Sequence, residues 1–301
     1  MDVDLVAAVR RFNRTVTQRV GALDDEYMAR GRPLGQARVL WEIGPDGAEV
    51  AGLRARLGLD SGYLSRLLRI LEADGLVTVG AAPDGGDARV RSAALTETGR
   101  AEWAELDRRS DALAWSILEP LGAPRRARLV AAMAEVERLL VASMVTIGPC
   151  PPGDPRARAC VRAYARDLAA RFPDGFDPAR SVPVRDEEVT PPAGVFLLAT
   201  LGAEPVGCGA VKLHPGGPAE IKRVWVSGTV RGLGVGRRLL GELEAYAARR
   251  GWTQARLDTN RSLVEAIALY RSAGYDETAR YNDEPYADFW FTKPIAAGVL
   301  D

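Results

Sequence analysis

The glycine-rich segment Arg231–Gly236, with the sequence RGLGVG, carries the clearest sign of chemistry in the chain. It follows a strand-like run over residues 221–226 and precedes an amphipathic helix. The apolar positions of that helix are Leu239, Leu240, Leu243 and Ala247. Glycines let several backbone amides converge on one point, and the dipole at a helix N-terminus favours negative charge. The segment therefore predicts a phosphate-binding turn.

Three phosphate-binding patterns compete for this turn. A P-loop requires Gly-Lys-Ser/Thr, whereas the chain offers Gly-Arg-Arg from Gly236 onward. A Rossmann fingerprint requires G-x-G-x-x-G, whereas Gly232, Gly234 and Gly236 run G-x-G-x-G. The third pattern, Arg/Gln-x-x-Gly-x-Gly/Ala, is satisfied by Arg231 together with Gly234 and Gly236. The third pattern is therefore the one that we retain.

The third pattern and its downstream context resemble the GNAT family of acetyltransferases. After the helix come a strand-like run, ARLDTN, and then SLVEAIALYRSAGY, so the resemblance spans residues 156–294. It implies an α/β GNAT (acyl-CoA N-acyltransferase) fold, acetyl-CoA as co-substrate and no metal. It also implies direct attack of a neutral amine on the thioester, without a covalent enzyme species.

The resemblance also implies roles for particular residues. The strand before the turn would leave backbone groups free for the pantetheine arm, and the turn would hold the pyrophosphate. The implied cofactor-binding residues are Val224, Val226, Arg231, Gly232, Gly234, Val235, Gly236, Arg237 and Asn260. Tyr270 would be the general acid that protonates the departing thiolate, because its hydroxyl stays protonated at neutral pH. Glu220 is our candidate general base, acting directly or through water.

Each of these roles has a structural alternative. Tyr270 shares a helix face with Leu263 and Ile267, which also suits a core aromatic. Glu220 enters a strand, where carboxylates are usually solvated, and Asn260 suits the closing of a turn. For the acceptor pocket we expect Trp225, Asn282 and Tyr286, although packing of a C-terminal strand explains such residues equally well.

The residue counts exclude several other chemistries. His214 is the only histidine, and the three cysteines lack metal-ligand spacing. A zinc site or a Ser-His-Asp triad is therefore close to excluded. No signal peptide and no stretch of about 18 apolar residues is found, so we expect a cytoplasmic protein.

The first half of the chain has the pattern of a helix–turn–helix. A helix over EVAGLRARLGL ends near Gly58, and Asp60 then provides an N-cap for a second helix. The second helix has one apolar stripe, formed by Leu64, Leu67, Leu68 and Leu71. Its remaining positions include Gly62, Ser65, Arg66 and Arg69. A small, cationic outer face of this kind suits the major groove of DNA.

A predicted β-hairpin follows this second helix. Two strand-like runs flank a tip rich in glycine and aspartate within VTVGAAPDGGDARVRSAAL, and Arg89 and Arg91 alternate with Val90 there. One of these arginines would reach the minor groove or a phosphate. The alternative is a helical dimerisation domain with solvated arginines, but the order of helix, turn, capped helix and basic hairpin favours DNA binding.

Residues 38–100 resemble the MarR family of winged-helix regulators, notably in YLSRLLRILEADGLV and in the Asp87-x-Arg89 element. The resemblance implies a homodimer held by helices at 3–30 and 101–145, and binding to pseudo-palindromic DNA. The implied DNA-binding residues are Ser61, Tyr63, Ser65, Arg66, Arg69 and Arg89. The domain order and the tail ARYNDEPYADFWFTK are similar to those of MarR–GNAT fusion proteins.

The length and charge of the chain fit this two-domain organisation. The 301 residues have a formal net charge of zero, so any DNA-binding surface must be a local cluster. Four prolines fall within IGPCPPGDP, and we take residues 147–155 as a linker between a mainly-α winged-helix domain and an α/β domain. The predicted domains are therefore residues 1–146 and 156–301.

The sequence favours an acetyl-CoA-dependent N-acetyltransferase for a small-molecule amine, fused to a MarR-type DNA-binding regulator. One alternative is a regulator whose GNAT domain only senses acetyl-CoA or another ligand. Another is an enzyme whose winged-helix part only dimerises. Release of free CoA with candidate amines and salt-dependent DNA binding distinguish these hypotheses.

Overall fold

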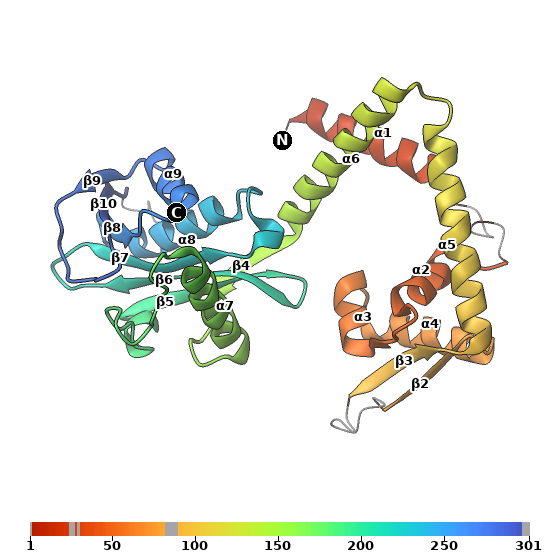
Figure 1. Cartoon of the computed structure of the whole chain (residues 1–301), viewed down its shortest axis with the longest axis horizontal. Helices are drawn as coiled ribbons and strands as arrows, with labels where there is room; N and C mark the ends of the chain where they lie inside the picture. The colour runs from red at the N-terminus through yellow and green to blue at the C-terminus, as the bar shows by residue number, and fades with distance from the viewer. Residues whose placement is uncertain (1, 24–27, 29–30, 82–89, 297–301) are drawn as a thin grey trace. The chain divides into compact units, whose positions relative to one another are not determined.

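The computed structural model describes residues 2–23, 28, 31–81 and 90–296, and the chain divides into two compact units, residues 1–133 and 134–301. Each unit has its own hydrophobic core. Figure 1 shows the helices and strands of both units. The boundary lies inside helix α6, Ala123–Met144. The predicted order of a helical winged-helix part and a later α/β part is confirmed.

The first unit combines helices with a small antiparallel sheet. Before α6 its helices are α1 Val3–Arg19, α2 Leu34–Ile43, α3 Val50–Leu57, α4 Ser61–Ala73 and α5 Glu97–Leu118. Its strands are β1 Ala48–Glu49, β2 Val77–Ala81 and β3 Arg91–Leu95, in the order β1-β3-β2.

The predicted helix–turn–helix is present as α3 and α4. Helix α3 ends where Gly58 adopts a left-handed conformation with φ of 63°, which glycine reaches without steric cost. Asp60 then caps α4 by accepting a hydrogen bond from the Tyr63 amide at 2.8 Å. The whole predicted stripe of α4 is buried, with Leu64, Leu67, Leu68 and Leu71 at most 6% exposed. The capping and periodicity of this segment therefore placed both helices correctly.

The predicted wing is present as the antiparallel pair of β2 and β3, with Val77 opposite Leu95 and Ala81 opposite Arg91. Its tip, which includes Arg89, lies outside the described residues. Gly99 of α5 packs directly on the wing, because a Cβ atom there would lie 1.9 Å from the Leu76 carbonyl oxygen. Close backbone contact thus fixes the wing against α5.

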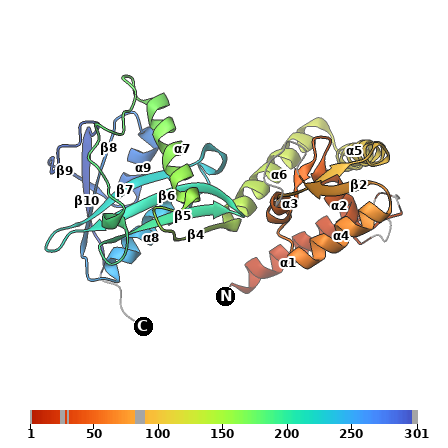
Figure 2. The same ribbon diagram turned by 90° about the horizontal axis from the view of Figure 1, so that it is seen from below.

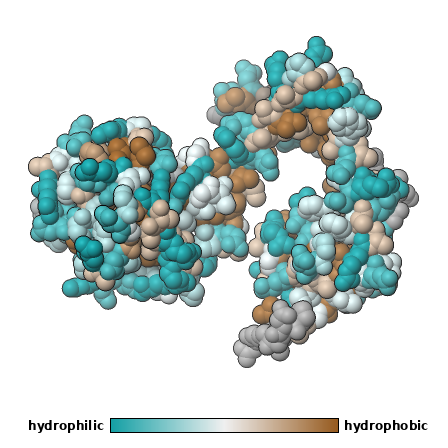
Figure 3. All heavy atoms as spheres, viewed as in Figure 1, coloured by the Kyte–Doolittle hydropathy of each residue, from teal (hydrophilic) through white to brown (hydrophobic). Residues whose placement is uncertain are grey.

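The helices predicted to hold a dimer are α1, α5 and α6. None of the residues of α1 is buried within one chain. Its exposed apolar side chains include Val3, Leu5, Val9 and Phe12, which are 47–73% exposed. Brown apolar atoms lie among teal ones over this region of the first unit in Figure 3. The helix therefore presents apolar side chains that the described residues of its own chain leave exposed.

The second unit is built around one seven-stranded sheet with the order β4-β5-β6-β7-β8-β10-β9. The strands are β4 Val145–Pro149, β5 Gly194–Leu201, β6 Glu204–Leu213, β7 Ala219–Val226, β8 Gln254–Thr259, β9 Asp276–Thr278 and β10 Phe289–Pro294. The helices are α7 Pro155–Arg171, α8 Val235–Ala248 and α9 Val264–Ser272, with short 3₁₀ turns η2 Glu187–Val189 and η3 Gly228–Val230. The strand-like runs predicted over residues 221–226 and at ARLDTN are confirmed as β7 and β8.

Helices cover both faces of this sheet. Residues of α7 pack with Phe196, Leu198 and Ala210 on one face, and residues of α8 and α9 pack with Val195 and Val211 on the other. Figure 2 shows α7 and α8 on opposite sides of β5 and β6. In the described part of the chain, no helix is both long and apolar enough to cross a membrane.

The predicted linker at residues 147–155 is not a free connection. Its first residues belong to β4, an edge strand that pairs with β5 from Val145↔Leu201 to Pro149↔Leu197. Its last residue, Pro155, starts α7 behind the N-cap Asp154. The prolines excluded a central strand but not an edge strand, whose outer side needs no donor, nor the first position of a helix.

Candidate functional site

Strands β7 and β8 run side by side in parallel for only two residue pairs, Ala219↔Ala255 and Glu220↔Arg256. Beyond these pairs the strands separate, so the second half of β7 has no ladder partner on the β8 side. Two clefts open where the strands diverge. The divergence that the sequence led us to expect before the glycine-rich turn is therefore present.

The first cleft, which we call the Gly-loop cleft, lies against the glycine-rich turn. It is lined by the predicted cofactor residues Val224, Val226, Arg231, Gly232, Gly234, Gly236 and Arg237, together with residues of α7 and α9. Gly232 and Gly234 have φ of 76° and 77°, a region that favours glycine. Helix α8 begins after Gly234 without a side-chain cap, so its first-turn amides are available to an anion.

Side chains at this turn hold its shape. The Arg231 guanidinium donates to the Val226 carbonyl at 2.9 Å and pairs with Asp167 of α7 at 2.6 Å. Arg237 donates to the Ser272 carbonyl at 3.3 Å. The Val235 side chain is buried in the core, so only its backbone can serve a ligand in the cleft. The arginines thus tie the turn to β7, α7 and the end of α9.

The second cleft, which we call the aromatic cleft, lies on the other side of the divergence. Its aromatic residues are Tyr164, Phe172, Phe176, Tyr270 and Tyr286. Its charged residues are Lys222, Arg223, Asp258 and Glu284. The rings of Phe176 and Tyr286 lie 4.9 Å apart between centroids, and those of Phe172 and Tyr286 lie 5.8 Å apart. The cleft therefore combines an apolar wall with charges of both signs.

Tyr270 lies where the two clefts meet, because it lines both of them. Its side chain is only 6% exposed, and burial, with a smaller contribution from Asp258, raises the pKa of its hydroxyl. The ring also packs against Tyr275 and Phe291, with centroids 6.0 and 6.1 Å apart. The position of Tyr270 is therefore compatible with both roles considered for it. Its ring packs in the core, as a core aromatic does, and the residue borders both clefts, as a general acid must.

Tyr164 of α7 also lines both clefts, and the sequence reasoning did not identify it. Burial raises the pKa of its hydroxyl as well. Helical periodicity marks the face on which Tyr164 lies but cannot show which strands that face will meet.

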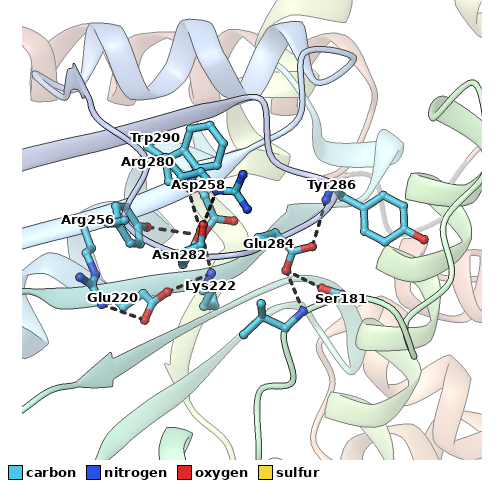
Figure 4. A network of polar contacts seen from close by, with 12 residues as sticks. Ser181, Glu220, Lys222, Arg256, Asp258, Arg280, Asn282, Glu284, Tyr286 and Trp290 are labelled. Atoms are coloured by element: carbon cyan, nitrogen blue, oxygen red, sulfur yellow. Dashed lines mark hydrogen bonds and ion pairs between the residues drawn. The ribbon is translucent and has the colours of Figure 1, made fainter.

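Glu220 lies outside both clefts, contrary to the role of general base considered for it. Glu220 is 5% exposed, and its carboxylate contacts Lys222 at 3.0 Å and Arg256 at 3.5 Å (Figure 4). It also contacts His214 at 2.8 Å. Burial alone would raise the pKa of Glu220, but Lys222 and the other partners lower it to about 2. Because a general base works best with a pKa near the operating pH, this locked anion is poorly suited to that role.

Lys222 forms ion pairs with both Glu220 and Asp258, and Asp258 lines the aromatic cleft. It pairs with Lys222 and accepts a hydrogen bond from the Asn282 amide at 2.9 Å. Asn282 in turn accepts from the Trp290 indole at 2.8 Å, so it orients Asp258 from outside the cleft (Figure 4). The sequence reasoning expected Asn282 in the acceptor pocket, and only Tyr286 of the three expected residues lines the aromatic cleft.

Two other predicted residues have different positions from those expected. Trp225 lines the Gly-loop cleft and donates to Asp167 at 3.2 Å. Asn260 lines the aromatic cleft, where it donates to the Tyr286 carbonyl at 2.7 Å and accepts from the Ser262 amide at 2.9 Å. Asn260 therefore closes the turn after β8, which is the alternative considered for it.

The outer face of α4 is the candidate DNA interface of the first unit. Ser61, Tyr63, Arg66 and Arg69 are exposed, and Ser65 is partly buried. Arg66 stacks over the Tyr63 ring with 5.3 Å between the guanidinium carbon and the centroid. Among the described residues, neither Arg66 nor Arg69 has an ion-pair partner within 4 Å. The helix therefore presents two cations that remain available to phosphates or bases.

Comparisons with known proteins match the two units separately. Residues 161–275 match the model of the acetyltransferase (GNAT) family, and residues 30–89 match that of the MarR family. An IAA acetyltransferase from Azospirillum brasilense is 36% identical over 104 residues, which cover 33% of this chain and 67% of the relative. An uncharacterized N-acetyltransferase from Schizosaccharomyces pombe is 37% identical over 98 residues, or 32% of this chain and 60% of the relative.

Among solved structures, a mutant of MarR from Escherichia coli complexed with operator DNA is 21% identical. The superposed region includes 45% of this chain and 99% of the MarR chain, with a TM-score of 0.38.

Proposed function

The chain belongs to the GNAT family of acetyltransferases through residues 161–275 and to the MarR family through residues 30–89, and from this we propose its substrates and partners. The protein transfers an acetyl group from acetyl-CoA to the amine of a small molecule. Its first unit binds double-stranded DNA as a homodimer.

The meeting of the two clefts at Tyr270 is the observation that supports acetyl transfer. The Gly-loop cleft offers uncapped helix amides for a pyrophosphate and the free edge of β7 for a pantetheine arm. Acetyl-CoA supplies an acyl group activated as a thioester. The aromatic cleft, on the other side of Tyr270, is open to an acceptor. These features are compatible with bound acetyl-CoA and support an acceptor site on the other side of Tyr270.

The residues of the site have distinct proposed roles. The backbone from Arg231 to Arg237 holds the pyrophosphate, and Val224 and Val226 offer backbone groups to the pantetheine arm. Tyr270 donates a proton to the leaving thiolate, since a buried tyrosine remains protonated at neutral pH. In place of Glu220, the carboxylates that line the aromatic cleft, Asp258 and Glu284, are the proposed proton acceptors.

The proposal for DNA binding rests on the capped α4, its unpaired arginines and the wing beside it. A recognition helix of this kind lies in the major groove, and a symmetric dimer presents it twice. The exposed apolar face of α1 supports the homodimer, because such a face is usually covered in the functional assembly.

Calorimetric titration with acetyl-CoA tests the site. We expect wild-type protein to bind, and Gly234→Glu to bind at least about tenfold more weakly, because a side chain is strained at φ of 77° and its charge repels phosphate. Gly241→Glu is the matched control, since Gly241 lies in the same helix, is exposed and has open space around it. Circular dichroism checks that each variant is folded.

Two outcomes would contradict the proposal. Folded wild-type protein that does not bind acetyl-CoA would overturn acetyl transfer. Protein that binds acetyl-CoA but releases no CoA with a broad panel of amines would instead be a sensor of acetyl-CoA.

A further inference from the structure

The aromatic cleft contains two charged groups of opposite sign that do not pair with each other. Of its four charged lining residues, Lys222 and Asp258 form an ion pair. Among the described residues, the remaining two, Arg223 and Glu284, have no ion-pair partner within 4 Å. A charge that is largely removed from water and lacks a counter-ion is costly, which suggests that a ligand supplies the counter-ion.

Arg223 is held in the cleft by an irregularity of β7. Its φ is 56°, unusual for a residue other than glycine. The pairing of β6 with β7 passes from Ala210↔Lys222 to Cys208↔Trp225, so that Arg223 and Val224 together lie opposite one residue of β6. The guanidinium donates one hydrogen bond, to the Val184 carbonyl at 3.2 Å. Burial lowers the pKa of Arg223, yet an arginine remains charged at neutral pH. Since a guanidinium has five N–H donors, most of them remain available to a planar anion.

The nearby carboxylate of Asp186 does not neutralise Arg223. Its effect on Arg223 is electrostatic only, and its own ion pair is with Arg158. A ligand carboxylate in the cleft would therefore meet a guanidinium without a competing partner.

Glu284 provides a negative charge in the same cleft as the positively charged Arg223. It is 8% exposed, and within the part of the chain that the structure describes its carboxylate accepts from neutral donors only: the Ser181 hydroxyl at 2.8 Å, the Val182 amide at 2.9 Å and the Tyr286 amide at 3.3 Å. Figure 4 shows Ser181 and Tyr286 joined to Glu284 by dashed lines. These donors fix the carboxylate in place without neutralising its charge. The rings of Phe172, Phe176 and Tyr286 form an apolar wall of the same cleft.

We infer that the acceptor is a free amino acid with an apolar side chain, whose carboxylate pairs with Arg223 and whose ammonium group, before it loses its proton, pairs with Glu284. Its side chain packs on the rings of Phe172, Phe176 and Tyr286. This inference rests on the proposed acetyltransferase function, because it names the chemical class of the acceptor. A simple amine would leave Arg223 without a counter-ion, and a simple carboxylic acid would leave Glu284 without one.

Matched pairs of acceptors test the carboxylate requirement. Leucine, methionine and phenylalanine are compared with isoamylamine, 3-(methylthio)propylamine and phenethylamine, which lack only the carboxylate. Release of CoA from acetyl-CoA measures turnover, and calorimetric titration with and without CoA measures binding. We expect at least one amino acid to have a kcat/KM at least about tenfold above that of its amine.

Variants of Arg223 test whether this residue causes the preference for an amino acid over the amine that lacks its carboxylate. We expect Arg223→Met to abolish the preference for the amino acid by raising its KM at least about tenfold, while the matching amine is unaffected. Arg223→Lys, which keeps the charge but loses the planar fork, should restore part of the preference. Glu284→Gln should weaken binding of both members of a pair, because both carry the ammonium group. Unchanged affinity for acetyl-CoA shows that each variant is folded.

Two results would overturn the inference while leaving the proposed function intact. One is that acetyl-CoA binds but every amine is used as well as its amino acid. The other is that acetyl-CoA binds but none of the three amino acids binds or reacts. Failure of wild-type protein to bind acetyl-CoA would count against the proposed function instead, and the titrations of amino acids without CoA would still decide whether Arg223 and Glu284 bind them.

Discussion

Tyr270 packs against other aromatic rings and also borders both clefts, so its ring and its hydroxyl can be tested apart. We predict that Tyr270→Phe lowers kcat by about 100-fold, because only the proton donor is lost. The dissociation constant for acetyl-CoA should change little. Steady-state kinetics and calorimetry measure the two quantities.

Tyr275→Phe is the control for this prediction. Tyr275 is 3% exposed and packs on Tyr270, but it lines neither cleft. Its variant should keep the wild-type kcat. If Tyr270→Phe also kept it, Tyr270 would be a core aromatic without a role in proton transfer.

Glu220 should contribute to stability rather than to proton transfer. Its pKa is lowered from 4.5 to about 2 in the folded chain, so its ion pairs stabilise the protein above pH 4.5 and are progressively lost as the pH falls toward 2. We predict that Glu220→Gln lowers the free energy of unfolding at pH 7 by at most about 3 kcal/mol. Thermal melting of both proteins from pH 7 downward should show that the difference shrinks below pH 4.5.

The dependence of the reaction rate on pH tests whether Glu220 takes part in proton transfer. The profile of Glu220→Gln between pH 6 and 9 should keep the shape of the wild-type profile. A lost ionisation in that range would restore Glu220 as the general base.

At the scale of elements, α5 approaches the backbone that leads into the wing most closely at Gly99. We predict that Gly99→Ala destabilises the first unit by about 1–3 kcal/mol, because its Cβ would lie 1.9 Å from the Leu76 carbonyl oxygen and the elements must separate. Gly122→Ala is the control, since nothing lies within 4 Å of a Cβ there. Calorimetry should show a lower unfolding temperature of the first unit for Gly99→Ala but not for Gly122→Ala. The same unfolding temperature for both variants would contradict the close approach.

Helix α4 should bind DNA mainly through its exposed arginines. We predict that Arg66→Ala and Arg69→Ala each weaken binding to a duplex selected from random sequences. If the lost contact is to a phosphate, the slope of log affinity against log salt should fall by about 1. Fluorescence anisotropy at several salt concentrations measures both effects.

Glu72→Gln in the same helix is the control for α4, because it removes a negative charge rather than a cation. It should not weaken binding. If both arginine variants bound DNA as tightly as the wild type, the first unit would not use α4 to bind DNA.

At the scale of the whole molecule, α1 has a face that one chain leaves uncovered. Phe12 is 47% exposed on the same stripe as Val9, and Arg14 lies on the opposite side of the helix. We predict that Phe12→Glu shifts the protein from dimer to monomer in size-exclusion chromatography with light scattering, because a charge would be buried in the interface. Arg14→Glu should remain dimeric, and a dimeric Phe12→Glu variant would exclude this face.

The local features of this protein could be predicted from its amino-acid sequence. The N-cap at Asp60 and the leucine stripe of α4 placed the helix–turn–helix, since capping and periodicity act within a few residues. The spacing of Gly232, Gly234 and Gly236 located the turn before α8, because positive φ at two of these positions favours glycine. The resemblance to two families supplied the assignment of both units.

Which residues share the site could not be predicted in this way and becomes apparent in the folded chain. Tyr164, Arg223 and Glu284 come from α7, β7 and the segment before β10, and nothing local to any of them indicates that they line one cleft. In the same way, only the folded chain shows that Glu220 lies outside both clefts and contacts His214, Lys222 and Arg256. The strand β4 depends on pairing with residues about 50 positions later. Burial, ion pairing and strand pairing are contacts between distant segments, and only the folded chain brings those segments together.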